Sequence, residues 1–117
     1  MADAERAVVH AFPMRRETDD RNARLLEAAD ALVPALMDRA AEAESLGRLP
    51  DATPRDFHDT GLFRILQPRA VGGAELDYVA LVDFGEAVAR GCASSAWVLT
   101  NLASHHWLLA MWPKAAQ

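Results

Sequence analysis

Hydrophobic side chains recur every three to four residues in the first half of the chain, at Leu25, Ala29, Leu32, Leu36, Ala40 and Ala43. This period predicts one amphipathic helix, beginning at Asp19 or Asp20, where the helix dipole favours acids, and ending at Gly47. Pro34 lies inside the pattern, where a proline removes a backbone donor and costs about 3 kcal/mol. We therefore expect a kink or a brief break near Val33.

A second, very short helix is expected next. Thr53 can cap its start, Pro54 suits its first position, and Asp56 stands where a capping-box acid would be. Gly61 ends this helix. The apolar residues Leu62, Phe63, Ile65 and Leu66 that follow predict an extended stretch that covers part of the core.

Two further helices complete the pattern. One starts at the cap residue Asp77 and closes at Gly91, and its expected buried side holds Val79, Leu81, Val82, Ala87 and Val88. The other starts at Ser94 or Ser95 and runs to about Trp112, before a proline. Since no strand alternation emerges, the fold class is all-α, with about four helices, a long loop and no sheet.

Residues 1–18 show no sustained period and carry Pro13, so they read as a flexible N-terminal arm, leaving residues 19–117 as one helical domain. The 117 residues are 51% hydrophobic, enough for one modest core. The net charge of −5 argues against nucleic-acid binding. A single cysteine, Cys92, and the lack of a signal-peptide pattern favour the cytoplasm. Polar residues interrupt the last helix, which argues against a membrane span.

Candidate chemistry lies on the helix from about Ser94 to Trp112, which is apolar nearly all round and therefore expected to be covered on both faces. Trp97, Asn101 and His105 follow one another at a spacing of four and so share one side of this helix. One interpretation is a ligand cavity with an apolar wall and two polar groups. The other is that both polar side chains bond nearby backbone while the tryptophan is core.

Other polar residues suggest less. His105 and His106 point about 100° apart on a helix and cannot both bind one metal, so no metal site is expected. Cys92 lies at a helix junction and is interpreted as a packing residue. Arg69 could approach an anion, although a solvated arginine is the simpler interpretation.

The order of these features resembles the N-terminal domain of acyl-CoA dehydrogenases. The similarity covers about Arg24 to Gln117 and includes Ala-Glu-Ala-Glu-Ser-Leu-Gly-Arg-Leu-Pro at 41–50 and Gly-Leu-Phe-Arg-Ile-Leu-Gln-Pro-Arg-Ala-Val-Gly-Gly at 61–73. Members of that superfamily continue through a β-domain and a C-terminal helical bundle, which hold most flavin contacts and the tetramer interface. The resemblance therefore implies a truncated domain that is inactive alone, from a homo-oligomer.

Three segments resemble one branch, the oxygenase components of two-component monooxygenases that hydroxylate phenols. They are Ala-Ser-Ser-Ala-Trp-Val at 93–98, Ser-His-His-Trp at 104–107 and Trp-Pro-Lys-Ala-Ala-Gln at 112–117. This branch implies an aromatic substrate, O2, reduced flavin (FMNH2 or FADH2) and a flavin reductase as partner. His105 would share the phenol proton as catalytic acid-base, while Trp97 and Asn101 would line the substrate pocket. His106 departs from the asparagine of the branch.

Two alternatives remain beside this hypothesis. The first is the same domain from an acyl-CoA dehydrogenase, where the helix with His105 would line an acyl-thioester site. The second is a non-catalytic helical interaction module or truncated remnant. It predicts self-association through the apolar surface of that helix.

Overall fold

The computed structural model describes residues 15–117, and the fold is all-α as predicted. The helices are α1 (Arg15–Leu46), α2 (Ala52–Asp59), α3 (Ala80–Ala89) and α4 (Ala93–Ala110). Three short 3-10 turns, η1 (Leu62–Arg64), η2 (Arg69–Val71) and η3 (Lys114–Ala116), complete the described part, in which no strand occurs. Residues 1–14 of the expected N-terminal arm lie outside the described residues, whereas 15–18 belong to α1.

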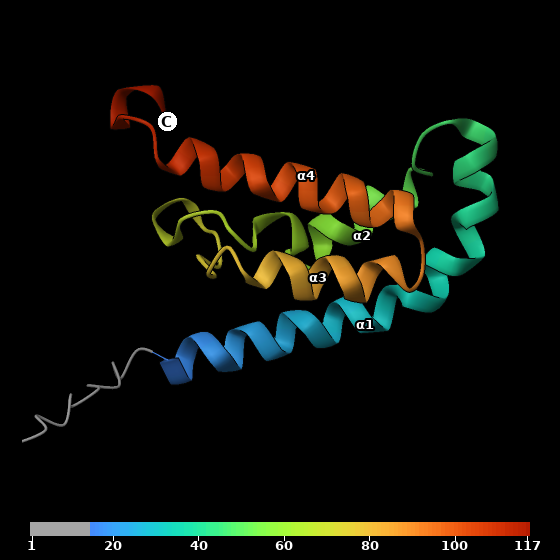
Figure 1. The fold of residues 1–117 in the computed structure, drawn as a ribbon, viewed down its shortest axis with the longest axis horizontal. Coiled ribbons are helices and arrows are strands. Elements are labelled where there is room, and N and C mark those ends of the chain that lie inside the picture. Colours follow the sequence, from blue (N-terminus) through green and yellow to red (C-terminus); the bar gives the residue numbers. More distant parts are fainter. Residues whose placement is uncertain (1–14) are drawn as a thin grey trace, which may run out of the picture.

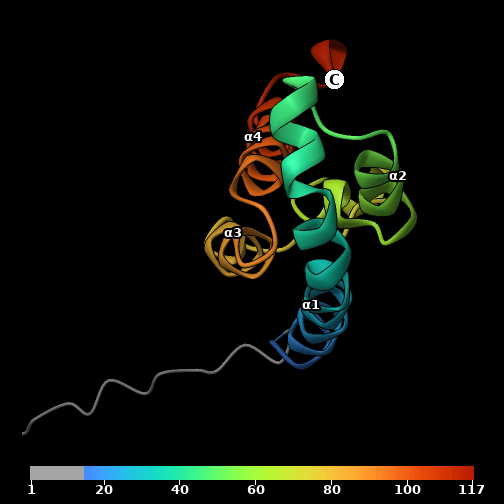
Figure 2. The same cartoon turned by 90° about the vertical axis from the view of Figure 1, so that its right-hand side faces the viewer.

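Helices α3 and α4 lie side by side, with α3 between α4 and the first part of α1 (Figure 1). Figure 2 shows α2 and α3 on opposite sides of the bundle. Within the described residues, no helix is long and apolar enough to cross a membrane.

Helix α1 begins at Arg15, four or five residues before the expected start at Asp19 or Asp20, and runs without a break through Pro34. It changes direction in its second half (Figure 1), where its ribbon is teal. A proline inside a helix bends it because the missing donor and the ring disturb the preceding turn. The expected break is therefore absent, and a bend accompanies the proline.

The core lies where α1, α3 and α4 meet η1. Phe57 of α2 and Phe63 of η1 pack edge to face, with ring centroids 5.4 Å apart. Such an aromatic pair adds about 0.5–1.5 kcal/mol beyond the burial of its area. The largest side chains that are almost completely buried come from every helix and from the segment after α2: Phe57, Phe84, Leu36, Leu62, Ile65, Leu99 and Val88.

The apolar residues Leu62, Phe63, Ile65 and Leu66 are buried as predicted, but their segment is not extended. Gly61, with a φ of 80°, starts a 3-10 turn in which the Arg64 N–H donates to the Gly61 carbonyl at 3.0 Å. An extended segment would need a partner strand for its N–H and C=O groups, and the described chain has none. The turn satisfies part of these groups locally, and the N–H groups of Ala74 and Leu76 donate to the Arg64 and Ile65 carbonyls at 2.9 Å, while the apolar side chains still reach the core.

The predicted capping of the short helix is wrong. Asp51 occupies the cap position without a side-chain cap bond, and Thr53 lies inside the first turn, buried, where its hydroxyl has no hydrogen-bond partner among the described residues. Asp56 instead accepts a hydrogen bond from Arg39 of α1 at 2.6 Å. The acid therefore ties α2 to α1 rather than closing a capping box.

The expected buried side of α3 is only partly right. Ala87 and Val88 are buried together with Ala80 and Phe84, whereas Val79 and Val82 are 70% and 66% exposed. Hydrophobic residues occupy two phases of the helical period here, and the phase with Phe84 buries more area. The two valines consequently form a separate exposed stripe.

Candidate functional site

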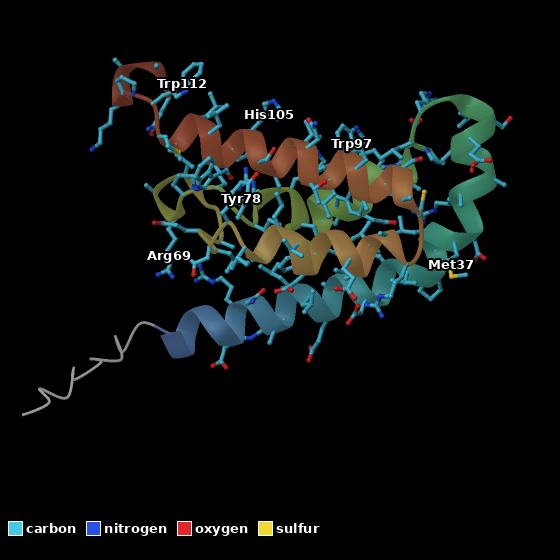
Figure 3. All side chains as sticks on the ribbon, viewed as in Figure 1. Met37, Arg69, Tyr78, Trp97, His105 and Trp112 are labelled. Atoms are coloured by element: carbon cyan, nitrogen blue, oxygen red, sulfur yellow. The ribbon has the colours of Figure 1, made fainter. Side chains whose placement is uncertain are left out.

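Helix α4 has a packed face of mostly small side chains and an opposite face that is open. Its buried residues are Ser95, Ala96, Leu99 and Ala103. Trp97 and His105 project from the side of α4 that faces away from α3 (Figure 3), and both are exposed. Asn101 lies one helical turn from each, because a spacing of four keeps residues on one side. The spacing argument from the sequence thus holds for the helix geometry.

The imidazole of His105 is fixed by its own helix. Its Nδ1 lies 2.6 Å from the Asn101 carbonyl oxygen. Since a carbonyl oxygen only accepts, Nδ1 must carry the proton in this bond, and in the neutral ring Nε2 then keeps a lone pair. The same carbonyl accepts the Ser104 hydroxyl at 2.7 Å. The ring is therefore oriented by backbone while Nε2 stays available to a ligand.

Trp97 forms one wall of a cavity of about 540 Å³. It is 69% exposed, so it is not a core residue of this domain. The other walls come from the start of α4 and the end of α1: Ala43, Glu44, Gly47, Arg48, Leu49, Ala93, Ser94 and Val98. Asn101 and His105 do not line this cavity but continue the same open face toward the end of α4.

His106 points to the other side of α4 from its neighbour. Its Nδ1 lies 2.8 Å from the carbonyl oxygen of Phe63 in η1, and its ring is partly buried. The two histidines thus diverge as the helix geometry predicts, one bonded to the domain and one open. Among the described residues, no group of three or more His, Cys, Asp and Glu could hold a metal ion.

Further aromatic and aliphatic side chains are exposed near the C-terminal end of α4, on more than one side of the helix. Trp107 is partly exposed and contacts Tyr78, with ring centroids 4.8 Å apart. Leu108, Met111 and Trp112 are exposed as well. The amount of apolar surface on α4 agrees with a helix that is hydrophobic nearly all round.

Sequence reasoning missed a second hollow, at the N-terminal part of α1. Arg21 and Arg24 of α1 meet Arg64 and Arg69 there, at a cavity of about 790 Å³. Of these four arginines, the sequence indicates only Arg69 as a candidate anion contact. The other three come from two further segments, and linear spacing carries no signal for such a cluster.

Comparison with known proteins gives a consistent result. The family described as acyl-CoA dehydrogenase, N-terminal domain, matches residues 18–117. The chain is 38% identical over 92 residues to the flavin-dependent monooxygenase, oxygenase subunit HsaA, of Rhodococcus jostii strain RHA1, covering 79% of this chain and 24% of the relative. It is 37% identical over 78 residues to the FADH(2)-dependent resorcinol hydroxylase, oxygenase component, of Rhizobium sp. strain MTP-10005, covering 67% of this chain and 19% of that protein.

Among solved structures, XiaF from Streptomyces sp. in complex with FADH2 and glycerol superimposes with a TM-score of 0.82 at 30% identity, covering 90% of this chain and 26% of that one. The chain spans about a quarter of the length of the HsaA relatives. Together, the match over residues 18–117 and the four-helix architecture show that this chain belongs to the acyl-CoA dehydrogenase N-terminal domain family.

Proposed function

We propose that this chain is the N-terminal helical domain of a flavin-dependent monooxygenase that hydroxylates a phenolic or related aromatic substrate with reduced flavin and O2. The observation that carries the proposal is the fixed His105 ring, whose Nε2 is open beside Asn101 and Trp97. The similarity to hydroxylase oxygenase components supports the same reaction class. Catalysis would belong to the complete enzyme, and the domain alone would be inactive.

In this proposal His105 acts as the catalytic acid-base. A phenol O–H donates to Nε2, and as the proton moves toward the ring nitrogen, electron density rises on the aromatic carbons that receive oxygen. The bond from Nδ1 to the Asn101 carbonyl, 2.6 Å long, keeps the lone pair of Nε2 directed outward. The Asn101 amide would orient the substrate, and the Trp97 ring would form an apolar wall against it.

The open face of α4 fits one wall of a flavin and substrate site. It offers an exposed aromatic plane at Trp97 and polar groups at Asn101 and His105, which suits flat rings with polar edges. When bound, reduced flavin supplies the two electrons that activate O2 for transfer of one oxygen atom to the substrate. A flavin reductase partner, assembly into a homo-oligomer and a cytoplasmic location belong to the same proposal.

A domain exchange tests the proposal. Residues 18–117 would replace the corresponding N-terminal segment of the HsaA monooxygenase from M. tuberculosis, whose structure superimposes with a TM-score of 0.79 at 36% identity. With a flavin reductase, we expect the chimera to hydroxylate a phenol. His105→Ala should lower kcat by about 100-fold or more, the usual contribution of a general acid-base. His58→Ala, which removes an exposed histidine on α2, is the matched control and should leave kcat unchanged.

Two outcomes would contradict the proposal. Thioester oxidation by the chimera without a reductase would favour acyl-CoA dehydrogenase chemistry. Hydroxylation that survives His105→Ala would remove the acid-base role from this residue. If the chimera does not fold, titration of the 117-residue chain with a phenol, followed by NMR, should shift the signals of His105 and Asn101 before those of His106.

A further inference from the structure

A basic hollow lies between the N-terminal part of α1 and the loop that follows η1, away from the Trp97 end of α4. Arg21, Arg24, Arg64 and Arg69 line this cavity of about 790 Å³, and Asp20 is the one carboxylate among its lining residues. Four guanidinium groups against one carboxylate leave a net charge of +3, in a chain whose overall charge is −5. Positive charge is therefore concentrated at this place.

Outside the hollow, three of the four arginines whose side chains are described pair with a carboxylate, whereas Arg55 donates only to a backbone carbonyl. Arg39, Arg48 and Arg90 each form a salt bridge with an aspartate. Among the described side chains, no carboxylate lies within salt-bridge distance of Arg64 or Arg69. Both guanidinium groups are exposed, and the nearby Glu75 carboxylate accepts a hydrogen bond from the Arg69 backbone N–H, at 2.7 Å, and not from its side chain.

The loop geometry holds the hollow open. Gly72 has a φ of 90°, and a Cβ at this position would come within 3.1 Å of the Arg64 guanidinium. The Arg21 guanidinium donates to the Ala74 carbonyl at 3.4 Å, which links α1 to the loop. Arg69 lies between this loop and α1 (Figure 3). The charges thus come from three segments that the fold brings together, around the apolar side chain of Leu25.

We infer that this hollow binds a phosphate or diphosphate group of a small molecule. A single carboxylate would neutralise one of three excess charges, whereas a phosphate group carries about −1.5 to −2 at neutral pH and accepts paired N–H bonds from arginine. A bound anion would also reduce the mutual repulsion of the four exposed guanidinium groups. The site is separate from the α4 face, and the inference does not depend on the proposed oxygenase function.

Isothermal titration of the 117-residue chain with pyrophosphate tests the inference, at low ionic strength because salt screens exposed charges. Saturable 1:1 binding is expected, with weaker binding of inorganic phosphate. Arg64→Gln and Arg69→Gln should each weaken binding by about threefold or more, and the double variant by about tenfold or more. Arg55→Gln is the matched control, since this exposed arginine donates to the Asp51 carbonyl, outside the hollow.

Several results would overturn the inference. They are the absence of saturable pyrophosphate binding, equal weakening by Arg55→Gln, and equally tight binding of citrate, which would show a general attraction of polyanions. Two measurements separate a lost site from a lost fold. Urea unfolding of each variant reports whether the fold is intact. The ³¹P NMR line width of pyrophosphate in the presence of Arg69→Gln reports whether this variant still binds it.

Discussion

Gly91 lies close against α1 in the connection between α3 and α4, and Gly91→Ala gives a direct test of this packing. A Cβ at this position would lie 2.7 Å from the Leu36 Cβ and 2.8 Å from the Val33 carbonyl oxygen. The second contact is backbone of α1 and cannot rotate away. Overpacking of this kind costs about 1–3 kcal/mol. The lower entropy of an unfolded chain with alanine offsets about 0.4–1 kcal/mol of that.

We therefore expect Gly91→Ala to lower the free energy of unfolding by about 1–2 kcal/mol, and the melting midpoint by about 5–15 °C for a chain of this size. Urea titration followed by circular dichroism at 222 nm measures the first quantity. The control is Gly85→Ala in α3, where the new Cβ would meet only the Thr100 methyl group, at 3.1 Å.

At Gly85, alanine gains about 1 kcal/mol in helix propensity, which opposes the cost of crowding the Thr100 methyl group. The net change in the free energy of unfolding should therefore stay within about 1 kcal/mol. The argument is refuted if Gly91→Ala is as stable as the parent chain, or if both variants lose the same amount. The first result would mean that α1 and the α3–α4 connection are further apart than described. The second would mean that the two helices α3 and α4 cannot adjust either.

Three further predictions concern polar contacts. Arg39→Gln should lower the free energy of unfolding by about 1 kcal/mol, because the salt bridge to Asp56 on α2 is partly buried, with side-chain exposures of 26% and 31%. Arg48→Gln, at an exposed salt bridge, should lower it by almost nothing. Urea unfolding measures both. His106→Ala should lower stability by about 1–2 kcal/mol by leaving a backbone carbonyl without its partner, while His105→Ala should leave stability unchanged; equal effects would contradict this division. The hydrogen bond and charge of Arg48 hold the pKa of Asp51 below its usual value, so its contribution to stability exists above the ordinary carboxyl range and is lost as pH falls through the lowered pKa. Carboxyl NMR titration of Arg48→Gln should show the Asp51 pKa returning upward.

The sequence predicted those features that depend on local geometry. The helices follow from periodicity, and Trp97, Asn101 and His105 share a side of α4 because their spacing alone requires it. The turn at residues 62–66 was not predictable, since an apolar run does not say whether a partner strand exists elsewhere. Nor was the arginine cluster, whose members come from distant segments that meet only in the folded chain.

Hydropathy was also unable to say which face of α4 is packed, because large apolar residues surround this helix. Side-chain size is the better signal: the packed face carries Ser95, Ala96 and Ala103, whereas Trp97 and Trp107 are at least partly exposed. Small residues let a neighbouring helix approach closely. Helix α3 does so, since a Cβ added at Gly85 would lie only 3.1 Å from the Thr100 methyl group.

The packed and open faces of α4 also explain the different contacts of the two adjacent histidines. His106 stands on the packed side, where its Nδ1–H donates a hydrogen bond to the Phe63 carbonyl, and so it can fix the rotation of α4 about its axis against η1. His105 stands about 100° further round, and its ring is held by the carbonyl of its own helix. A change at His106 should therefore alter the direction in which the His105 Nε2 points as well as the stability. In the chimeric oxygenase, His106→Ala should accordingly raise the KM for a phenol, and an unchanged KM would mean that the rotation of α4 is set by its apolar contacts alone.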